Sequence, residues 1–435
     1  MGYILIIYKV TTMATIENLI LAIDIENLYS VRDRIHIDFR AANIKTQRAK
    51  LLSDNIFEWN GQKILKTIGL FGPNAAGKSN IIRAIRFCCM MILESHQNNE
   101  NTTFAFAPFR FQGYPSKPSF FRILFVSEGI EYEYAYSFTR TEILEESLYY
   151  YPIGRKVKIF TRKGNIYSFG TTKVFHQPKI ITEYTSSKTL FLSRASSMKQ
   201  PLAQQLFRFF NEHFMLGIAP IQDVYKQTFL NQYKHLVLRL LTLCDSDICD
   251  IRSQTVKTGT TVQISVDDKP TAAPQQLEMT RIFTYHREDP NVPFAIEEES
   301  AGTLQILGLI PRLIGVHAAN KALILDEFDT MLHVRMTEFV LNYIRASESS
   351  QFLFSSHNTS LINMEHFRRD QILFVEKDNT GNTIIKPLYN FKSFRENMDA
   401  SKGYVNGHFG AIPNIENSVP VLKQLLKNPD LCFTE

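Results

Sequence analysis

Apolar residues gather along this chain in short runs and in stretches with helical spacing. One mostly apolar run precedes a glycine-rich segment and predicts a strand: Ile64, Leu65, Ile68, Leu70 and Phe71. After Ser79 the spacing changes to that of one helix face: Ile81, Ile82, Ile85, Cys88, Cys89 and Ile92. The pattern therefore predicts a strand, a glycine loop and a helix in succession.

Further runs predict the rest of a layered α/β protein. The stretch from Ala322 to Leu325 has no polar position, which is typical of a parallel strand buried on both faces. Other predicted strands are 351–355, 119–126 and 131–139. Helices are expected at Gln204–Phe214 and Gln227–Leu243, whose apolar spacing suits a lid, a dimer surface or an ordinary core helix.

The loop after the first strand carries the first candidate chemistry. It matches GxxxxGK[ST], in which backbone N–H groups and a helix N-terminus surround phosphates. Lys78 would reach the β and γ oxygens of ATP, and the Ser79 hydroxyl would face Mg²⁺. The expected nucleotide-binding residues are Gly72, Asn74, Ala75, Ala76, Gly77, Lys78 and Ser79.

Two acids follow the buried strand, at Asp326 and Glu327. Acids often end a buried strand where it meets solvent, but ligands of α/β sheets bind at this edge. We therefore assign Asp326 to Mg²⁺ and Glu327 to the attacking water. His357 follows the strand 351–355 and is expected at the same edge, where it would sense the γ-phosphate.

Upstream, Ser300 precedes a largely apolar stretch and reads as a helix N-cap, followed by Gly302. The segment is either a capped helix start or a second anion site made by that helix N-terminus. The acids at 297–299 interact favourably with the positive end of the helix dipole but would repel a phosphate, so both interpretations stay open.

Together these segments carry a family resemblance. The order of P-loop, serine-glycine helix start, strand-Asp-Glu and strand-His is that of ABC-type ATPases. More closely, the chain resembles RloA/AbiLi-like ATPases of bacterial anti-phage systems, which are relatives of OLD-family ATPases. Besides the P-loop, the likeness lies in Glu299–Thr303, Asp326–His333, Arg368–Asp378, Lys402–Tyr404 and Gly410–Pro413.

The resemblance implies a dimer with composite ATP sites. Ser300 and Gly302 of one copy would close over the P-loop nucleotide of the other, and His357 would be the switch histidine. The chain departs from the family patterns in two places: the turn reads SAGT rather than LSGGQ, and the loop after Glu327 ends in His333. Gln112 is a weak candidate for the glutamine loop and is more simply a loop residue.

OLD-family relatives also carry a Toprim nuclease, which needs a glutamate and a DxD pair. No DxD follows Asp378, and Asp245-Ser246-Asp247 reads as a polar turn after a helix. A separate Toprim-like nuclease is therefore the partner that the resemblance implies. The predicted function is an ATPase that controls this toxic effector in phage defence; the alternative is an SMC-like ATPase of DNA maintenance.

The uneven distribution of charge leaves the SMC-like alternative open. Residues 153–200 contain ten Lys or Arg residues and one acid, Glu183, with aromatic residues interleaved. This composition suits a nucleic-acid backbone and its bases, an acidic protein partner, or a solvated sheet face. The residues that would test it are Arg155, Lys156, Lys158, Arg162 and Lys163.

Length and composition set the remaining expectations. We predict an N-terminal ATPase lobe at 13–140, an inserted β/helical lobe at 141–280 and a C-terminal ATPase lobe at 281–435. Five cysteines without a zinc-like array suggest reduced thiols, with Cys244 and Cys249 as packing residues. No stretch suggests membrane insertion, so a cytoplasmic protein is expected, with translation starting at Met1 or Met13.

Overall fold

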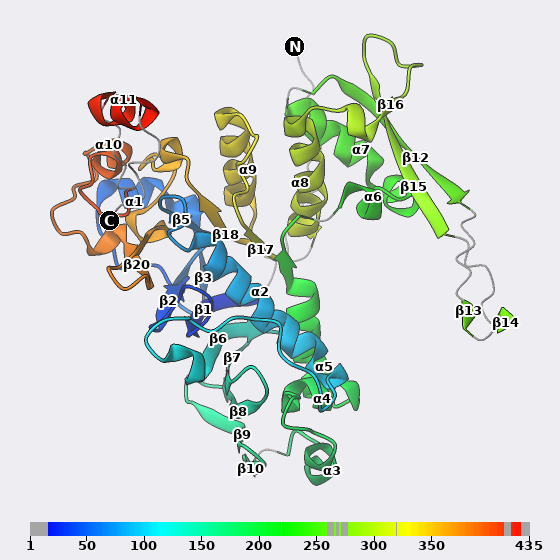
Figure 1. Cartoon of the computed structure of the whole chain (residues 1–435), viewed down its shortest axis with the longest axis vertical. Coiled ribbons are helices and arrows are strands. Elements are labelled where there is room, and N and C mark those ends of the chain that lie inside the picture. Colours follow the sequence, from blue (N-terminus) through cyan, green and yellow to red (C-terminus); the bar gives the residue numbers. More distant parts are fainter. Residues whose placement is uncertain are drawn as a thin grey trace.

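Two sheets form the body of the protein (Figure 1). The structure is a computed structural model, which describes residues 16–427 apart from 172, 219, 245, 259–264, 267–268, 271–276, 319 and 413–418. Met1, Met13, Asp245 and Pro413, which entered the sequence predictions, lie outside the described residues.

The first sheet is antiparallel and has the strand order β10-β9-β8-β7-β6-β1-β2. Alternation of buried and less buried positions along β6 shows why these residues form a sheet that is packed mainly on one face. The strands are β1 (Leu19–Glu26), β2 (Ile35–Asp38), β6 (Ser119–Ser127), β7 (Ile130–Phe138), β8 (Ile143–Tyr151), β9 (Val157–Lys163) and β10 (Ile166–Phe169).

The second sheet has the order β11-β17-β18-β5-β19-β20 and is parallel except for β20. Strands β5, β17 and β18 are buried along their whole length, as the apolar runs predicted. The strands are β5 (Thr67–Phe71), β11 (Phe214–Leu216), β17 (Ala322–Leu325), β18 (Gln351–Ser356), β19 (Ile372–Lys377) and β20 (Thr383–Pro387). The carboxyl ends of β17, β18 and β5 therefore meet at one edge.

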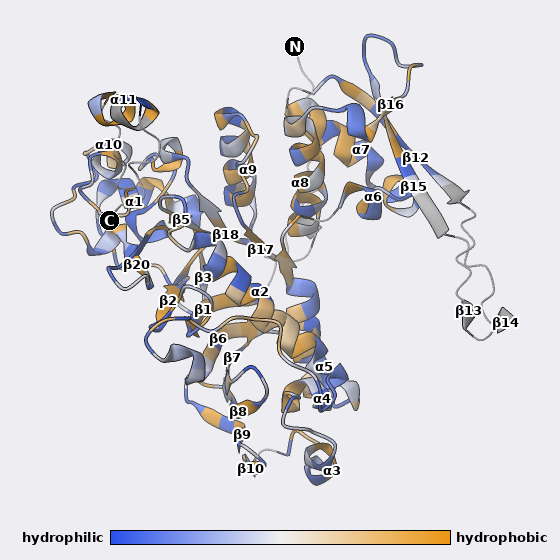
Figure 2. Ribbon diagram, in the orientation of Figure 1, coloured by the Kyte–Doolittle hydropathy of each residue, from blue (hydrophilic) through white to orange (hydrophobic). Residues whose placement is uncertain are grey.

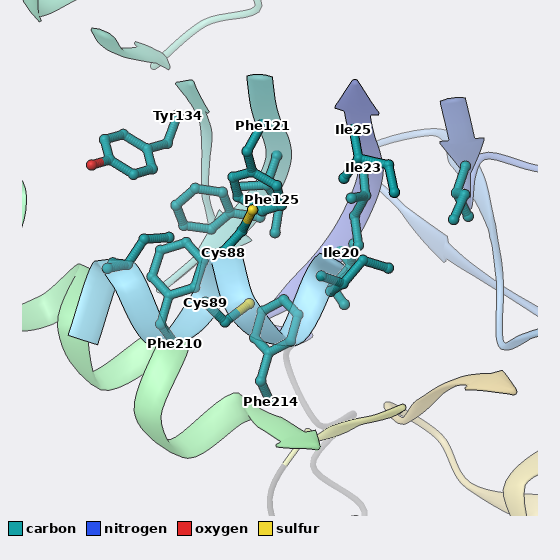
Figure 3. Close-up of a cluster of buried hydrophobic side chains, with 14 of the residues drawn as sticks. Ile20, Ile23, Ile25, Cys88, Cys89, Phe121, Phe125, Tyr134, Phe210 and Phe214 are labelled. Carbon is teal, nitrogen blue, oxygen red and sulfur yellow. The ribbon is translucent and has the colours of Figure 1, made fainter. Parts of the chain in front are cut away.

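Helix α2 (Lys78–Glu94) packs between the two sheets, and its apolar residues share one core with both (Figure 3). Cys88 and Cys89 point from α2 into this core, near Phe121 and Phe125 of β6. Burial raises the pKa of both thiols, so they are uncharged packing groups. Burying each large apolar side chain contributes about 1.5–3 kcal/mol, which fixes the helix against the sheets. Hydrophobic residues are dense on α2 and the central strands (Figure 2).

Helices cover the other face of the second sheet. Residues of α8 (Ala301–Ala318), α9 (Val334–Ala346) and α10 (Ala400–Val405) form a second core with β17, β18 and β19. The segment after α10 belongs to this core, because Phe409 stacks on Phe374 with ring centroids 5.0 Å apart. Helix α11 (Val419–Lys427) is the last described element.

A third core forms a smaller lobe beside α8 (Figure 1). Its elements are α6 (Ile221–Val224), α7 (Gln227–Leu243) and the sheet of β12 (Ile248–Thr258), β15 (Leu277–His286) and β16 (Phe294–Ala295). Strands β13 (Ser265–Val266) and β14 (Lys269–Pro270) form a separate two-stranded sheet. The remaining elements are α1 (Gln47–Leu51), β3 (Ile56–Trp59), β4 (Gln62–Leu65), α3 (Pro178–Glu183), α4 (Phe191–Ser197) and α5 (Pro201–Arg208).

Most predicted elements are confirmed, including the helix Gln227–Leu243 with the same bounds. Two predictions were wrong in detail. The run from Ile64 to Phe71 forms two strands, because β4 pairs with β3 whereas β5 pairs with β18 and β19. The helix expected to end at Phe214 ends earlier: α5 passes into a π-helical turn at Phe209–His213, and Phe214 begins β11.

The division of the chain at 140 and 280 remains a prediction. Strand β8 pairs along its length with β7, so the first sheet continues across residue 140. This pairing favours a first junction further along the chain, after β11. In the part of the chain that the structure describes, no helix is long and apolar enough to cross a membrane.

Candidate functional site

The P-loop connects the carboxyl end of β5 to the first turn of α2. Two of its glycines are sterically required. A Cβ on Gly72 would lie 2.2 Å from the carbonyl oxygen of Val375, and one on Gly77 would lie 2.0 Å from Oγ1 of Thr383. Gly77 also has φ +109°, a conformation that L side chains rarely adopt. Asn74 and Ala75 are exposed, whereas Ala76 and Gly77 are buried.

Lys78 is the first residue of α2 and only 4% exposed. Its Nζ donates hydrogen bonds to the carbonyl oxygens of Gly72 and Pro73, at 2.8 and 3.0 Å. Burial lowers the pKa of Lys78, although the charges of Glu327, Asp326 and Asp329 act in the opposite direction. The ammonium group therefore interacts electrostatically with the acids that follow β17. The next residue, Ser79, is exposed.

Ser355, at the end of β18, holds the acid pair in place. Its Oγ donates to Oδ1 of Asp326 at 2.5 Å and accepts a hydrogen bond from the backbone N–H of Glu327 at 2.8 Å. Ser355 itself is fully buried, whereas Asp326 is exposed and Glu327 is half-buried. Glu327 has φ +46°, which turns the chain sharply after the strand.

His357 lies at the same edge, as predicted from its place after a neighbouring strand. Its Nδ1 is 3.6 Å from Oε1 of Glu327, and both side chains are about half exposed. The residue before it, Ser356, donates to Oδ2 of Asp329 at 2.7 Å. The two loops that follow β17 and β18 are thus joined by hydrogen bonds, and their carboxylates and imidazole face solvent beside the P-loop lysine.

Ser300 and Gly302 lie elsewhere. Ser300 caps α8, because its Oγ accepts a hydrogen bond from the backbone N–H of Thr303 at 3.1 Å. Gly302 packs on the loop after β17, where an added Cβ would lie 3.1 Å from the carbonyl oxygen of Met331. Among the residues that the structure describes, no hydrogen bond or ion pair joins Ser300 or Gly302 to the P-loop of the same chain.

The acid before this turn is directed away from it. Glu299 accepts hydrogen bonds from Oγ1 of Thr284 and from Nε2 of His286, the latter at 3.0 Å. Burial lowers the pKa of His286, but the hydrogen bond to Asp247 and the charge of Glu299 outweigh it, so the pKa is raised. Glu299 is therefore held on β15 by Thr284 and His286, away from Ser300.

The sequence analysis missed two residues outside the P-loop that contact it through hydrogen bonds, Thr383 and Ser30. Oγ1 of Thr383 donates to the carbonyl oxygen of Ala76 at 3.0 Å and shares a hydrogen bond with Oγ of Ser30 at 2.8 Å. Ser30 also accepts from the side chain of Asn80 at 2.8 Å. No sequence pattern joins residues 30 and 383. Gln112, by contrast, is an exposed loop residue that accepts a hydrogen bond from Arg32 at 3.0 Å.

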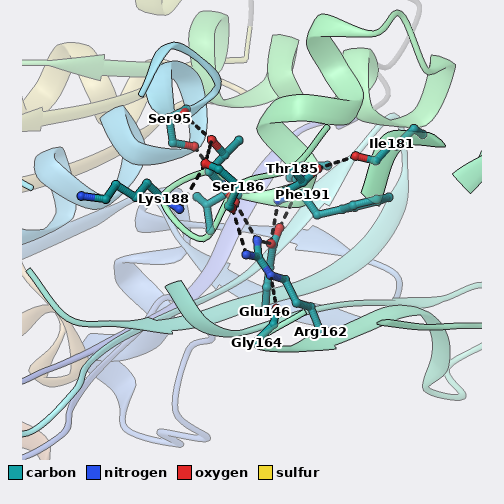
Figure 4. A network of polar contacts seen from close by, with 12 residues as sticks. Ser95, Glu146, Arg162, Gly164, Ile181, Thr185, Ser186, Lys188 and Phe191 are labelled. Atoms are coloured by element: carbon teal, nitrogen blue, oxygen red, sulfur yellow. Dashed lines mark hydrogen bonds and ion pairs between the residues drawn. The ribbon is translucent and has the colours of Figure 1, made fainter. Parts of the chain in front are cut away.

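The basic region 153–200 is less free than its composition suggested (Figure 4). Arg162 was a wrong choice of surface residue: its side chain is fully buried, 3.6 Å from Glu146, and donates to the carbonyl oxygens of Gly164, Ser186 and Thr189. Lys156 is 2.7 Å from Glu133, and Lys163 is 3.4 Å from Glu145. These glutamates offset much of the positive charge on this sheet.

The donors at the P-loop edge suit Mg²⁺. This cation takes oxygen ligands, usually one or two from protein together with substrate phosphates and water. Ser79 and Asp326 both offer exposed oxygens beside the loop. In the described part of the chain, no cluster of three or more His, Cys, Asp or Glu side chains forms a dedicated metal cage. That arrangement fits a metal brought in with a nucleotide.

Comparison with solved structures gives distant matches. The SMC head domain from Thermotoga maritima is 14% identical, covers 85% of this chain and 98% of its own, and has a TM-score of 0.38. An Smc head domain with an extended coiled coil, bound to the C-terminal domain of ScpA and derived from Pyrococcus furiosus, is 12% identical, covers 86% and 97%, and has a TM-score of 0.38. No curated protein matches the chain.

The family comparison covers more of the site. A family model described as "AAA domain, putative AbiEii toxin, Type IV TA system" matches residues 68–175 and 193–363, which is more than half of the chain. The match includes the P-loop, the acids after β17 and His357. With its parallel sheet, P-loop and helices on both faces, the chain has the α/β fold of an ABC-type P-loop NTPase. The chain therefore belongs to this AAA-domain family and is an ATPase-type protein.

Proposed function

We propose that this protein binds ATP with Mg²⁺ and hydrolyses it at the P-loop edge of the second sheet. One observation carries the proposal: the strand order β17-β18-β5 brings Glu327, His357 and Lys78 to the same edge, with Glu327 and His357 3.6 Å apart. A phosphate chain held by the P-loop would lie between the lysine and the acids, where phosphoryl transfer requires charge stabilisation and an oriented water.

Each residue then has a definite task. The N–H groups of Gly72–Lys78 would surround the phosphates, and Lys78 would exchange its two carbonyl partners for phosphate oxygens. Ser79 and Asp326 would hold Mg²⁺, which supplies charge neutralisation when bound. Glu327 would accept a proton from the attacking water, and His357 would donate to the terminal phosphate. Ser355 would keep both acids in position.

We further propose that the working form contains at least two copies. In the turn Ser300–Gly302 the first two residues are exposed and Gly302 packs on the loop of Met331, and no described hydrogen bond or ion pair joins the turn to its own P-loop. A second copy would place this turn over the nucleotide, where the free N–H groups of α8 favour an anion. Binding of ATP would then join the copies, and hydrolysis would separate them.

For the biological role we propose control of a separate toxic effector in phage defence, as in RloA/AbiLi-like systems. The family description, which names a type IV toxin–antitoxin system, supports this class of role. A Toprim-like nuclease remains the proposed partner. The segment of α7, β12 and β15 packs into one hydrophobic core and has no long heptad pattern, which disfavours the SMC-like alternative.

The decisive variant is Glu327→Gln, with Glu338→Gln as the matched control on α9, outside the site. We expect Glu327→Gln to bind ATP, form an ATP-dependent dimer in light scattering, and release phosphate at a small fraction of the normal rate. Lys78→Ala should fail to bind ATP at all. Normal turnover by Glu327→Gln would refute the catalytic assignment.

The effector role needs its own experiment. Tagged Glu327→Gln, purified from the native host with ATP present, should retain a stoichiometric second protein that has nuclease activity of its own. Mass spectrometry and a nuclease assay identify it. Recovery of the chain with nucleic acid and no second protein would favour the DNA-maintenance alternative instead.

A further inference from the structure

A groove lies between helix α7 and strand β12 in the small lobe, which stands apart from the two-sheet body (Figure 1). It has a volume of about 710 Å³, and none of the residues that line it is acidic. Leu230 and Ile251 are its buried apolar residues. Its polar walls include Lys234 and His235 from α7 and Arg252 from β12. The α7–β12 groove thus combines apolar and basic surface.

Strand β12 is the edge of its sheet, in the order β12-β15-β16, so only one of its sides pairs with another described strand. The N–H of Ile251 donates to Oδ1 of Asp250 at 2.9 Å and therefore points away from β15. In an antiparallel pair the backbone groups of alternate residues point to the same side, so the N–H and C=O of Ser253 point outward as well. Both Ile251 and Ser253 line the groove, so the unpaired edge of β12 faces it. An exposed strand edge is a template for pairing with another extended segment.

The charge of the groove indicates which side chains such a segment carries. Lys234 and Arg252 are two cations that share one carboxylate, that of Asp250. One positive charge is therefore in excess, before His235 is counted. A second copy of β12 would carry Asp250, Arg252 and Lys257, and thus a net positive charge that adds to the excess. A segment with acidic side chains would instead complement it.

We propose that the α7–β12 groove binds an extended, acidic segment of a partner protein, which adds to β12 as a further strand. In the role proposed above this partner is the effector, so the inference rests on that role and names the surface on which the effector docks. Main-chain hydrogen bonds to β12 would supply affinity. Alternate side chains of the segment would lie toward α7, where Lys234 and Arg252 select acidic ones.

The groove is also connected to the Ser300 turn. Ile251 is the cross-strand neighbour of Thr284 on β15. Thr284 and His286 hold the carboxylate of Glu299, the residue before Ser300. A strand added beside Ile251 would therefore act on the turn that closes over the nucleotide of the other copy in the proposed dimer. Binding of the partner and ATP-dependent assembly would then each change the affinity of the other.

The sharpest variant is Ser253→Pro. Because the N–H of Ser253 points away from β15, this change keeps the pairing within the sheet and removes a donor to an added strand. Ser253→Ala is the matched control, since both variants lose the hydroxyl that donates to Gln227 but only Ser253→Ala keeps the N–H. Arg252→Gln tests the charge, with Arg239→Gln, an exposed cation of α7 outside the groove, as its control. Circular dichroism verifies that each variant is folded.

The probe is a phage-displayed library of random twelve-residue peptides, selected on the full chain and counter-selected on Ser253→Pro. We expect the enriched peptides to carry acidic residues at alternate positions and, as synthetic peptides, to bind once per chain in fluorescence anisotropy. Arg252→Gln should weaken them about tenfold or more, as loss of a charge-assisted hydrogen bond implies. Ser253→Ala and Arg239→Gln should bind them as the unmodified chain does. In the native host, Glu327→Gln with Ser253→Pro should lose the second protein that Glu327→Gln with Ser253→Ala retains.

Three outcomes would overturn the proposal. One is that no peptide is enriched, and another is that Arg252→Gln binds the peptides as tightly as Arg239→Gln does. The third is that Ser253→Pro lowers the molar mass of the chain in light scattering without nucleotide, because the edge of β12 would then pair with a second copy. The peptide assay needs neither ATP nor the effector. Peptides that bind while no second protein is retained from the host would therefore support the groove and refute the effector role.

Discussion

Replacement of Ser355 by alanine should impair catalysis more than it impairs folding. The change removes the hydrogen bond donated to Asp326 and the one accepted from the N–H of Glu327. A hydrogen bond to a charged group contributes about 1.5–3 kcal/mol and a neutral one about 0.5–1.5 kcal/mol. Water can replace the first at the exposed Asp326, so we expect a loss of about 1–3 kcal/mol in the free energy of unfolding.

The effect on turnover follows from position rather than from charge. Without Ser355 the backbone N–H of Glu327, where φ is +46°, loses the side chain to which it donates. A displacement of about 1 Å at a catalytic group costs on the order of 100-fold in rate. We therefore expect kcat for ATP hydrolysis to fall about 100-fold, with little change in the affinity for ATP.

Ser350 provides the matched control. It is fully buried before the other end of β18, where its Oγ donates to the carbonyl oxygen of Val316 at 2.7 Å. Ser350→Ala should lower the free energy of unfolding in urea by a similar amount, about 1–2 kcal/mol, without changing kcat. Equal kcat for Ser355→Ala and Ser350→Ala would refute the positioning role of Ser355.

Three further predictions concern other parts of the chain. Gly77→Ala should abolish ATP binding in a fluorescent-nucleotide assay, because its Cβ would collide with Oγ1 of Thr383 at a φ of +109°. Arg162→Leu should lower the free energy of unfolding by about 3–5 kcal/mol, because it leaves Glu146 buried without its charged partner. Hydrogen bonds, first to Asp24, raise the pKa of His36 to about 9. The contribution of His36 to stability is therefore complete below about pH 6.5 and is lost as the pH rises through 9. NMR titration measures the pKa of His36, and melting temperatures at several pH values measure the change in stability.

Each of these predictions has a result that contradicts it. Normal ATP affinity in Gly77→Ala would mean that the loop opens away from β20. A stability of Arg162→Leu close to that of the unmodified protein would mean that the remaining donors satisfy Glu146: the backbone N–H groups of Phe191 and Leu192 and the hydroxyl of Tyr134. If His36 has an ordinary histidine pKa, or if His36→Gln leaves the pH dependence of melting unchanged, then the hydrogen bonds of His36 on β2 are not the cause of that pH dependence.

Local patterns predicted much of the fold because they reflect local physics. The strand Ala322–Leu325, the helix Gln227–Leu243 and the cap at Ser300 each depend on residues within a few positions. The split between β4 and β5 was missed because apolarity continues through it, and only pairing with different partner strands separates the two.

The candidate site shows the same limit. The P-loop and the acids after β17 could be found because their residue types are adjacent in sequence. Ser355 and Thr383 could not be found in this way, because serine and threonine are common and the roles of these two depend on tertiary contacts. A run of hydroxyl residues before His357 was the one available signal, and it does not by itself distinguish a supporting residue from a strand end.

The strand order of the second sheet has a consequence for synthesis of the chain. Strand β5 leaves the ribosome early, but its neighbours β18 and β19 are made only after residue 350. Until then the apolar P-loop strand has no partner on either side, and nucleotide cannot help the nascent chain to fold. Ribosome-bound chains, or chains truncated before β18, should therefore depend on chaperones, and the protein can become active only after β19 has been made.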